Sequence, residues 1–127
     1  GAPLVNTNHF VSPQMRDCLV AVGPPETRGC SGARYETVTN ALANAFGRID
    51  LTFSQRLMAL HKGRLESICR HPKAENEAAT ISASIMMPAQ RRMLFCHGLP
   101  CEGIYHDLAI DTGAQDGRAA PVSLGQA

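Results

Sequence analysis

The chain has 127 residues, 44% of them hydrophobic, and this length and composition fit one small domain with a single core. Its twelve Lys and Arg residues nearly balance eleven Asp and Glu residues, so we expect no basic surface for phosphate backbones and no nucleic-acid partner. No apolar run approaches the ~20 residues that cross a bilayer. No basic segment followed by a hydrophobic one opens the chain, so we expect no membrane partner.

The number and spacing of the cysteines further restrict the class of protein. They are odd in number and irregularly spaced, unlike the even frameworks of small secreted domains: Cys18, Cys30, Cys69, Cys96 and Cys101. We therefore expect reduced thiols and a cytoplasmic location.

The first half of the chain predicts one short strand and two helices. Residues 3–10 are apolar and β-prone before a Pro- and Gly-containing stretch, which predicts a strand that leads into a long loop. Residues 34–49 have apolar side chains at steps of three and four, as on one helix face: Tyr35, Val38, Leu42, Phe46 and Ile49. Thr52 and Gln55 form a capping-box pattern, which predicts a second, shorter helix that ends at residues 61–63.

The second half changes to a period of two, which is typical of strands. Apolar residues alternate with polar ones over residues 80–87 and again over 104–110, with a further strand expected at 92–97. These segments predict a three-stranded antiparallel meander preceded by helices, an α+β arrangement. Residues 111–127 contain few large apolar side chains, so we expect a disordered tail after a domain at 1–110. Helices on one face of such a sheet leave the other face bare, which indicates missing partner structure.

Several short motifs follow one another in an order that resembles a known enzyme family. They are Thr-Asn-His-Phe at 7–10, Ser31 with Arg34 at a helix start, residues 68–72, residues 80–85 and residues 98–101. Over residues 4–110 the ordered set resembles the C-terminal portion of the acyl-coenzyme A:6-aminopenicillanic acid acyltransferase family, the isopenicillin N acyltransferase-like proteins. This resemblance implies half of a four-layer αββα N-terminal nucleophile hydrolase fold, in which an autocatalytic cut exposes a cysteine that acts on linear amide bonds.

The same resemblance assigns catalytic roles to two residues and weaker, substrate-binding roles to two more. Asn8 matches an asparagine that stabilises the oxyanion, although Asn before a loop also commonly forms a turn. Arg34 matches an arginine that tunes charge around the nucleophile. The alternative is a solvated residue of the first helical turn, where the helix dipole disfavours Arg. For His9 the alternative is packing, and for Ser31 it is a helix cap.

The resemblance also implies where the nucleophile lies. In this class the nucleophilic cysteine is the first residue of its chain, and here that residue is Gly1, so Cys18 and Cys30 do not qualify. We therefore expect the cysteine in an upstream half or partner subunit. The expected substrate is a small-molecule amide or an acyl-coenzyme A, with no cofactor and with hydrolysis or acyl transfer both open.

Two other classes of function stay open beside the enzyme. A non-catalytic α+β binding module predicts a covered sheet, whereas a fragment predicts an exposed apolar face. A small zinc protein would use cysteines and histidines in the second half: Cys69, His71, Cys96, His97 and Cys101. Their spacings differ from the paired spacings of structural zinc sites, so from the sequence we expect no metal.

Overall fold

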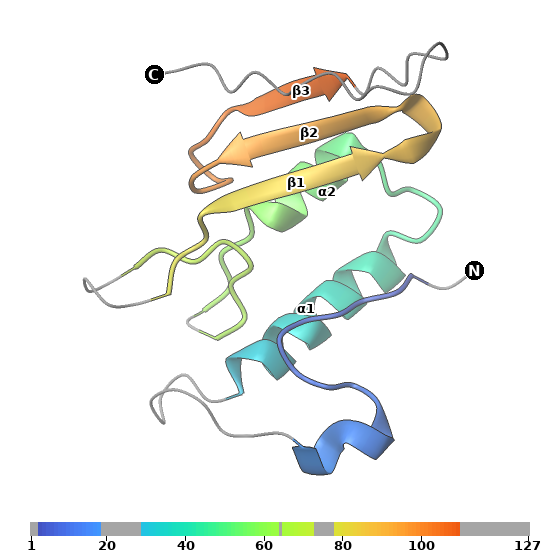
Figure 1. The fold of residues 1–127 in the computed structure, drawn as a ribbon, viewed down its shortest axis with the longest axis vertical. Helices are drawn as coiled ribbons and strands as arrows, with labels where there is room; N and C mark the ends of the chain where they lie inside the picture. The colour runs from blue at the N-terminus through green and yellow to red at the C-terminus, as the bar shows by residue number, and fades with distance from the viewer. Residues whose placement is uncertain (1–2, 19–28, 64, 73–77, 110–127) are drawn as a thin grey trace, which may run out of the picture.

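The computed structural model describes residues 3–18, 29–63, 65–72 and 78–109, and Figure 1 shows helices beside one small antiparallel sheet. The elements in chain order are η1 (Pro13–Cys18), α1 (Cys30–Asn44), α2 (Leu51–Met58), β1 (Ser82–Met87), η3 (Pro88–Gln90), β2 (Arg92–His97) and β3 (Tyr105–Ala109). The predicted α+β class is confirmed. Within the described residues, no helix is both long and apolar enough to cross a membrane.

The sheet has the predicted meander topology, with strand order β1-β2-β3 and both pairs antiparallel. The short helix η3 joins β1 to β2, and it ends at Arg91, whose φ of 51° lies in the left-handed region. The sequence therefore locates all three strands to within about two residues, because alternation along a strand is a local signal.

One face of the sheet forms the small core. Ala83 of β1 lies opposite Cys96 of β2, and Ile85 lies opposite Leu94, so these four side chains share a face. Ala83, Leu94 and Cys96 are at most 8% exposed. Helix α2 packs against β1 behind the sheet in the view of Figure 1. The buried face is therefore the face toward α2.

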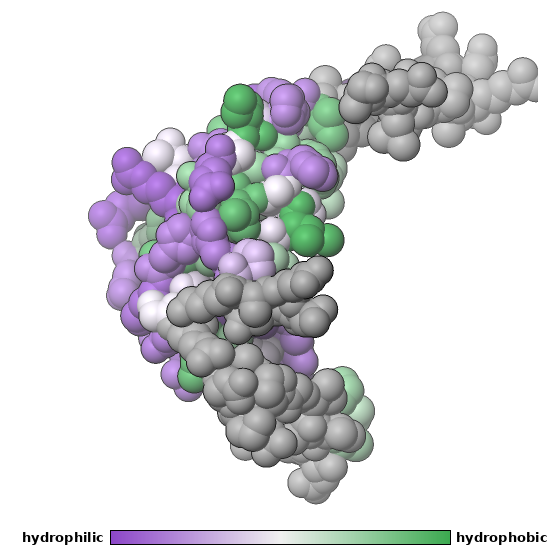
Figure 2. Space-filling view, turned by 90° about the vertical axis from the view of Figure 1, so that its left-hand side faces the viewer, coloured by the Kyte–Doolittle hydropathy of each residue, from purple (hydrophilic) through white to green (hydrophobic). Residues whose placement is uncertain are grey.

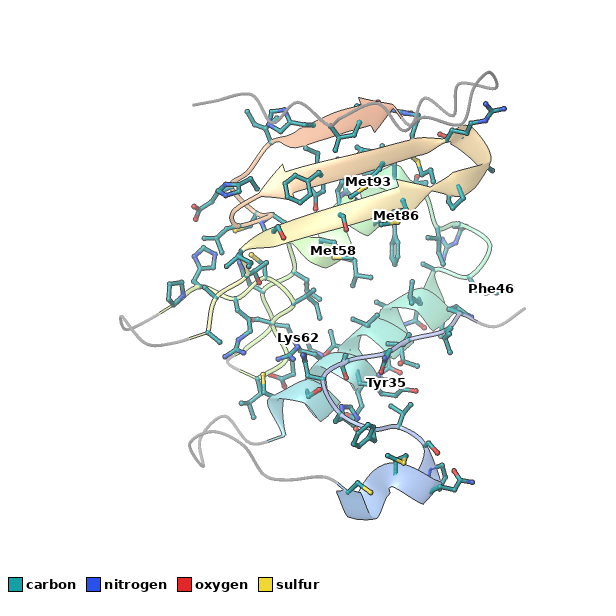
Figure 3. The ribbon with its side chains drawn as sticks, viewed as in Figure 1. Tyr35, Phe46, Met58, Lys62, Met86 and Met93 are labelled. Atoms are coloured by element: carbon teal, nitrogen blue, oxygen red, sulfur yellow. The ribbon has the colours of Figure 1, made fainter. Side chains whose placement is uncertain are left out.

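The opposite face of the sheet carries exposed apolar side chains. Met86, Met93 and Leu108 lie in register across the three strands, and Phe95 lies on the same face. Met86 is 66% exposed and Leu108 is 49% exposed. Figure 3 shows Met86 and Met93 side by side on β1 and β2. We call Met86, Met93, Phe95 and Leu108 the outer sheet face, and none of the described helices covers it.

Helix α1 is displaced toward the N-terminus relative to the predicted 34–49. It spans Cys30–Asn44, after an N-cap at Gly29 with φ 80°, which glycine adopts without steric cost. Phe46 and Ile49 lie beyond its end and are 61% and 45% exposed, so their assignment to the helix was wrong. Ser31 is inside the helix, so the alternative that it is the cap before the helix is also wrong.

Helix α2 begins one residue before the predicted capping pair. The N-cap is Asp50, whose carboxylate oxygen Oδ1 accepts a hydrogen bond of 2.7 Å from the backbone N–H of Phe53. Thr52 is therefore the second helical residue and not the cap. A carboxylate at this position satisfies an otherwise unpaired N–H and is favoured by the helix dipole.

The predicted strand at 3–10 is also wrong. None of the described strands includes this segment, which runs beside α1 instead (Figure 1). The predicted tail at 111–127 lies outside the described residues.

Candidate functional site

The structure brings Asn8 and Arg34 into direct contact at the start of α1. Arg34 Nη2 donates a hydrogen bond of 2.8 Å to Asn8 Oδ1, across a separation of 26 residues. A guanidinium group only donates, so this contact fixes which end of the amide faces Arg34. The Nδ2 amino group of Asn8 is consequently the end that is available to a ligand.

His9 and Ser31 form a second contact between the same two segments. His9 Nδ1 lies 2.9 Å from Ser31 Oγ and 3.0 Å from Thr7 Oγ1. The Thr7 hydroxyl donates to the Ser31 carbonyl at 3.1 Å, and the His9 ring meets Tyr35 edge-on with centroids 5.8 Å apart. His9 and Ser31 therefore hold residues 7–9 against α1, as the packing alternative for His9 predicts.

Burial alternates along this segment and directs Asn8 outward. Thr7 and His9 are partly buried against α1, whereas Asn6 and Asn8 are exposed. An open cavity of about 450 Å³ adjoins them, and the described residues of its lining are 6–12 and Cys18. This volume is within the range of small-molecule sites, which run from about 300 to 1,000 Å³.

Arg34 also contacts the thiol of Cys30. Its Nη1 donates to Cys30 Sγ at 2.6 Å, one helical turn away, while Nη2 reaches Asn8. Cys30 is 6% exposed, and its thiol donates to the Leu65 carbonyl at 3.2 Å. The two terminal nitrogens of the Arg34 guanidinium thus link Asn8 to the buried Cys30 on α1.

A separate group of thiols and imidazoles lies at the edge of the sheet. The side-chain donor atoms of His61, Cys69, His71 and Cys101 all lie within 4.8 Å of one another. Sequence reasoning included three of these residues but missed His61, which spacing alone does not connect to the others. Cys96 and His97, which it did include, are not members of this group.

Hydrogen bonds of the backbone explain how His61 reaches the other residues. The Leu60 carbonyl accepts from the N–H groups of Ile68 and Cys69, at 3.0 and 3.1 Å. This bond pair places residue 61 next to residues 69–71. His61 could not be assigned to this group from the sequence, because no local sequence pattern predicts the backbone hydrogen bonds to the Leu60 carbonyl.

Burial raises the pKa of two side chains in or beside this group, the Cys101 thiol and the Tyr105 hydroxyl. The pKa of the Cys101 thiol is raised by burial first, and then by its hydrogen bond with Cys69 and the nearby negative charges of Cys69 and Glu102. The pKa of Tyr105 is raised by burial first and then by Cys96 and Cys69. Both shifts favour the neutral, protonated side chain.

Comparison with protein-family models, with curated proteins and with solved structures gives no match.

Proposed function

We propose that this chain is part of a cysteine N-terminal nucleophile hydrolase or acyltransferase that acts on linear amide bonds. The observation that carries the proposal is the Arg34–Asn8 hydrogen bond. The resemblance assigned both residues to one site, although they are far apart in the sequence. Their direct contact supports the proposal that they belong to one site.

Asn8 suits the role of oxyanion donor for a chemical reason. Its oxygen is occupied by Arg34, so the Nδ2 group is oriented away from the guanidinium as a neutral N–H donor. When a thiolate attacks an amide or thioester carbonyl, the carbonyl oxygen becomes an anion that such a donor stabilises. Arg34 acts through Asn8 and is therefore a positioning residue in this account.

The nucleophile in this proposal comes from a segment or subunit outside the chain. Cys30 is buried and already bonded to Leu65 and Arg34, and Cys69 is 1% exposed in the other cluster. Cys18 is exposed and lines the same cavity as Asn8, so it is the internal competitor that an experiment must exclude. The supplied cysteine would use its own α-amino group as base.

The chemistry then follows the usual two steps of covalent catalysis. The thiolate sulfur bonds to the acyl carbon, and the amine or thiol leaving group departs with a proton. Water or a second amine next attacks the acyl-enzyme, which breaks the carbon–sulfur bond and regenerates the thiol. The substrate is a small-molecule amide or an acyl-coenzyme A, and these steps need no organic cofactor.

The outer sheet face supports a missing partner. It presents Met86, Met93 and Leu108 across three strands without cover from a described helix. A second sheet packs face to face on such a surface at about 10 Å, which is the central contact of a four-layer αββα fold. A self-contained binding module would cover this face, so the exposed face favours the fragment. The five cysteines form no disulfide in the structure, and we propose a cytosolic location for the protein.

The first test uses the complete product of the gene that encodes this chain. Intact mass should reveal cleavage directly before a cysteine upstream of the chain, and incubation with an ester or thioester should add one acyl group to that cysteine. Cys18→Ala should leave acylation unchanged. Acylation that disappears in Cys18→Ala, or a product with no processed cysteine, would contradict the proposal.

The second test separates donor chemistry from folding at Asn8. Asn8→Asp keeps an oxygen for Arg34 but replaces the N–H donor with a second acceptor, so kcat should fall about 100- to 1,000-fold, as in Asn8→Ala. Asn40→Ala, at an exposed position of α1 that is not in the described lining of this cavity, is the matched control and should keep full activity. Near-normal kcat in Asn8→Asp would refute the oxyanion role.

A further inference from the structure

The donor atoms of the thiol and imidazole group are spaced like the corners of a metal site. Cys69 Sγ lies 3.5 Å from Cys101 Sγ, and His71 Nε2 lies 3.2 Å from Cys101 Sγ and 3.1 Å from His61 Nε2. A tetrahedral zinc ion with ordinary bond lengths separates two sulfurs by about 3.8 Å, sulfur and nitrogen by about 3.5 Å, and two nitrogens by about 3.3 Å. Each of these three separations is within roughly 0.3 Å of that value, and the other three are at most 4.8 Å.

Hydrogen bonding alone does not satisfy this group of atoms. His71 Nε2 faces both His61 Nε2 and Cys101 Sγ, yet one ring nitrogen carries at most one proton. The thiols of Cys69 and Cys101 are weak donors and weak acceptors. One cation satisfies four ligand atoms that lie within 4.8 Å of one another better than these atoms satisfy each other.

The backbone holds the donors in place without a metal. The Leu60 carbonyl contacts described above position the loop after α2, and the N–H groups of Glu102 and Gly103 both bond the Leu99 carbonyl, at 3.0 and 2.8 Å, in the turn that presents Cys101. A Cβ atom on Gly103 would lie 2.4 Å from Cys96 Sγ, so this turn requires glycine. Cys101 thus projects from a tight turn between β2 and β3.

A carboxylate lies beside one of the proposed metal ligands. His71 Nδ1, on the side of the ring away from Nε2, lies 3.9 Å from Glu102 Oε1, which is longer than a hydrogen bond. A carboxylate that bonds this ring nitrogen orients a metal-bound histidine, and Glu102 is the carboxylate beside it.

We propose that His61, Cys69, His71 and Cys101 bind one Zn²⁺ ion in a closed, four-ligand structural site. Two thiolates and two imidazoles in a tetrahedral arrangement are the ligand set that zinc prefers. Binding displaces the two thiol protons to solvent, so the dication and two thiolates form a neutral site. The ion ties the loop after α2 and the loop before β1 to the β2–β3 turn. Figure 2 shows the molecule from the left-hand side of Figure 1, and the coloured residues of that face are mostly hydrophilic with separate apolar patches.

The test is direct metal binding to the purified protein, stripped with a chelator under reducing conditions. Titration with Zn²⁺ should give one ion per chain, and Co²⁺ should give the intense visible bands of a tetrahedral thiolate site. His61→Ala and Cys101→Ser should each weaken Zn²⁺ binding by more than about 100-fold, beyond the loss expected for an outer-shell partner. Glu102→Gln should weaken it by about 10- to 100-fold.

Matched controls come from residues of the same types outside the cluster. Cys18→Ser and His106→Ala, both at exposed positions, should bind one Zn²⁺ with unchanged affinity. The far-ultraviolet circular dichroism of the zinc-free variants identifies any that fail to fold, and His61→Ala, at an exposed position, is the safest of them. Octahedral Co²⁺ spectra, unchanged affinity in both His61→Ala and Cys101→Ser, or a Cys69–Cys101 disulfide in the protein as isolated would overturn the proposal.

Discussion

The two polar clusters of this protein differ in how their hydrogen bonds are satisfied. Beside Asn8 the two contacts that join residues 7–8 to α1 each pair a donor with an acceptor: Arg34 donates to the Asn8 amide oxygen, and the Thr7 hydroxyl donates to the Ser31 carbonyl. At the sheet edge, thiols and imidazole nitrogens of similar character face one another instead. A satisfied cluster orients an exposed group toward a substrate, whereas an unsatisfied one accommodates an ion.

The two regions also differ in burial. Among the described residues, the sheet and its adjoining loops hold most of the deeply buried side chains, including Cys69, Leu94 and Cys96, whereas Asn8 is exposed. The comparison therefore assigns stability to the sheet region and surface chemistry to the amino-terminal region. Changes in one region should leave the property of the other intact.

The largest expected effect is on stability, at the buried face of the sheet. Leu94→Ala should lower the free energy of unfolding by about 2–5 kcal/mol, because Leu94 is only 5% exposed. Met86→Ala, on the outer sheet face of the neighbouring strand, should change it by less than about 0.5 kcal/mol. Urea unfolding in the presence of a chelator measures both. Equal losses would mean that both faces of the sheet are packed.

A glycine pair tests the turn that presents Cys101. Gly103→Ala should destabilise by about 1–3 kcal/mol, because its Cβ would contact Cys96 Sγ and two backbone carbonyl oxygens. Gly32→Ala, inside α1 with no atom within 4 Å of the new Cβ, should instead stabilise by about 0.5–1 kcal/mol. Chemical denaturation gives both values, and the same sign for both would contradict the packing described.

The N-cap of α2 lies between α1 and the sheet in the chain, and it should contribute to stability. Asp50→Ala should cost about 1 kcal/mol of unfolding free energy, because it leaves the N–H of Phe53 unpaired. Thr52→Ala, at the position that the sequence pattern had favoured as the cap, should cost less than half as much. The reverse ranking in thermal or urea unfolding would restore Thr52 as the cap.

The smallest expected effect comes from the exposed pair of Arg92 and Asp107 on neighbouring strands. The hydrogen bond from Arg92 holds the pKa of the Asp107 carboxyl group below its usual value. The ionised pair therefore stabilises the fold above about pH 4. That contribution is lost as pH falls through the lowered pKa. The small difference in melting temperature between wild type and Asp107→Asn should therefore vanish in acid, and it should shrink in high salt. A difference that is independent of pH would exclude the charge as its cause.

The sequence predicted the strands better than the helix ends or the sites, for physical reasons. The alternation of apolar and polar residues around Ala83 and Ile85 is a local pattern, so it predicts a strand without information about the rest of the fold. The limits of α1 depend on Gly29 in the left-handed region, which apolar spacing does not reveal. Asp50 displaced Thr52 as the cap because its carboxylate is the group that reaches the N–H of Phe53.

The two clusters were predictable to different degrees. Asn8 and Arg34 were singled out through the ordered motifs of a resemblance, and no periodicity in the sequence predicts their contact. His61 was missed because its approach to His71 depends on backbone bonds to the Leu60 carbonyl. Contacts between loops depend on tertiary structure. A short sequence motif predicts such a contact only when the residue spacing of that kind of site is already known.

The most direct test of the catalytic account is a double-mutant cycle on Asn8 and Arg34 in the complete, processed protein. Arg34→Ala alone should lower kcat, because the amide of Asn8 loses the bond that orients it. In the Asn8→Ala background the same change should have almost no further effect, so the double variant should match Asn8→Ala. Losses in kcat that multiply would show that Arg34 acts independently of Asn8, and would contradict the arrangement proposed for this site.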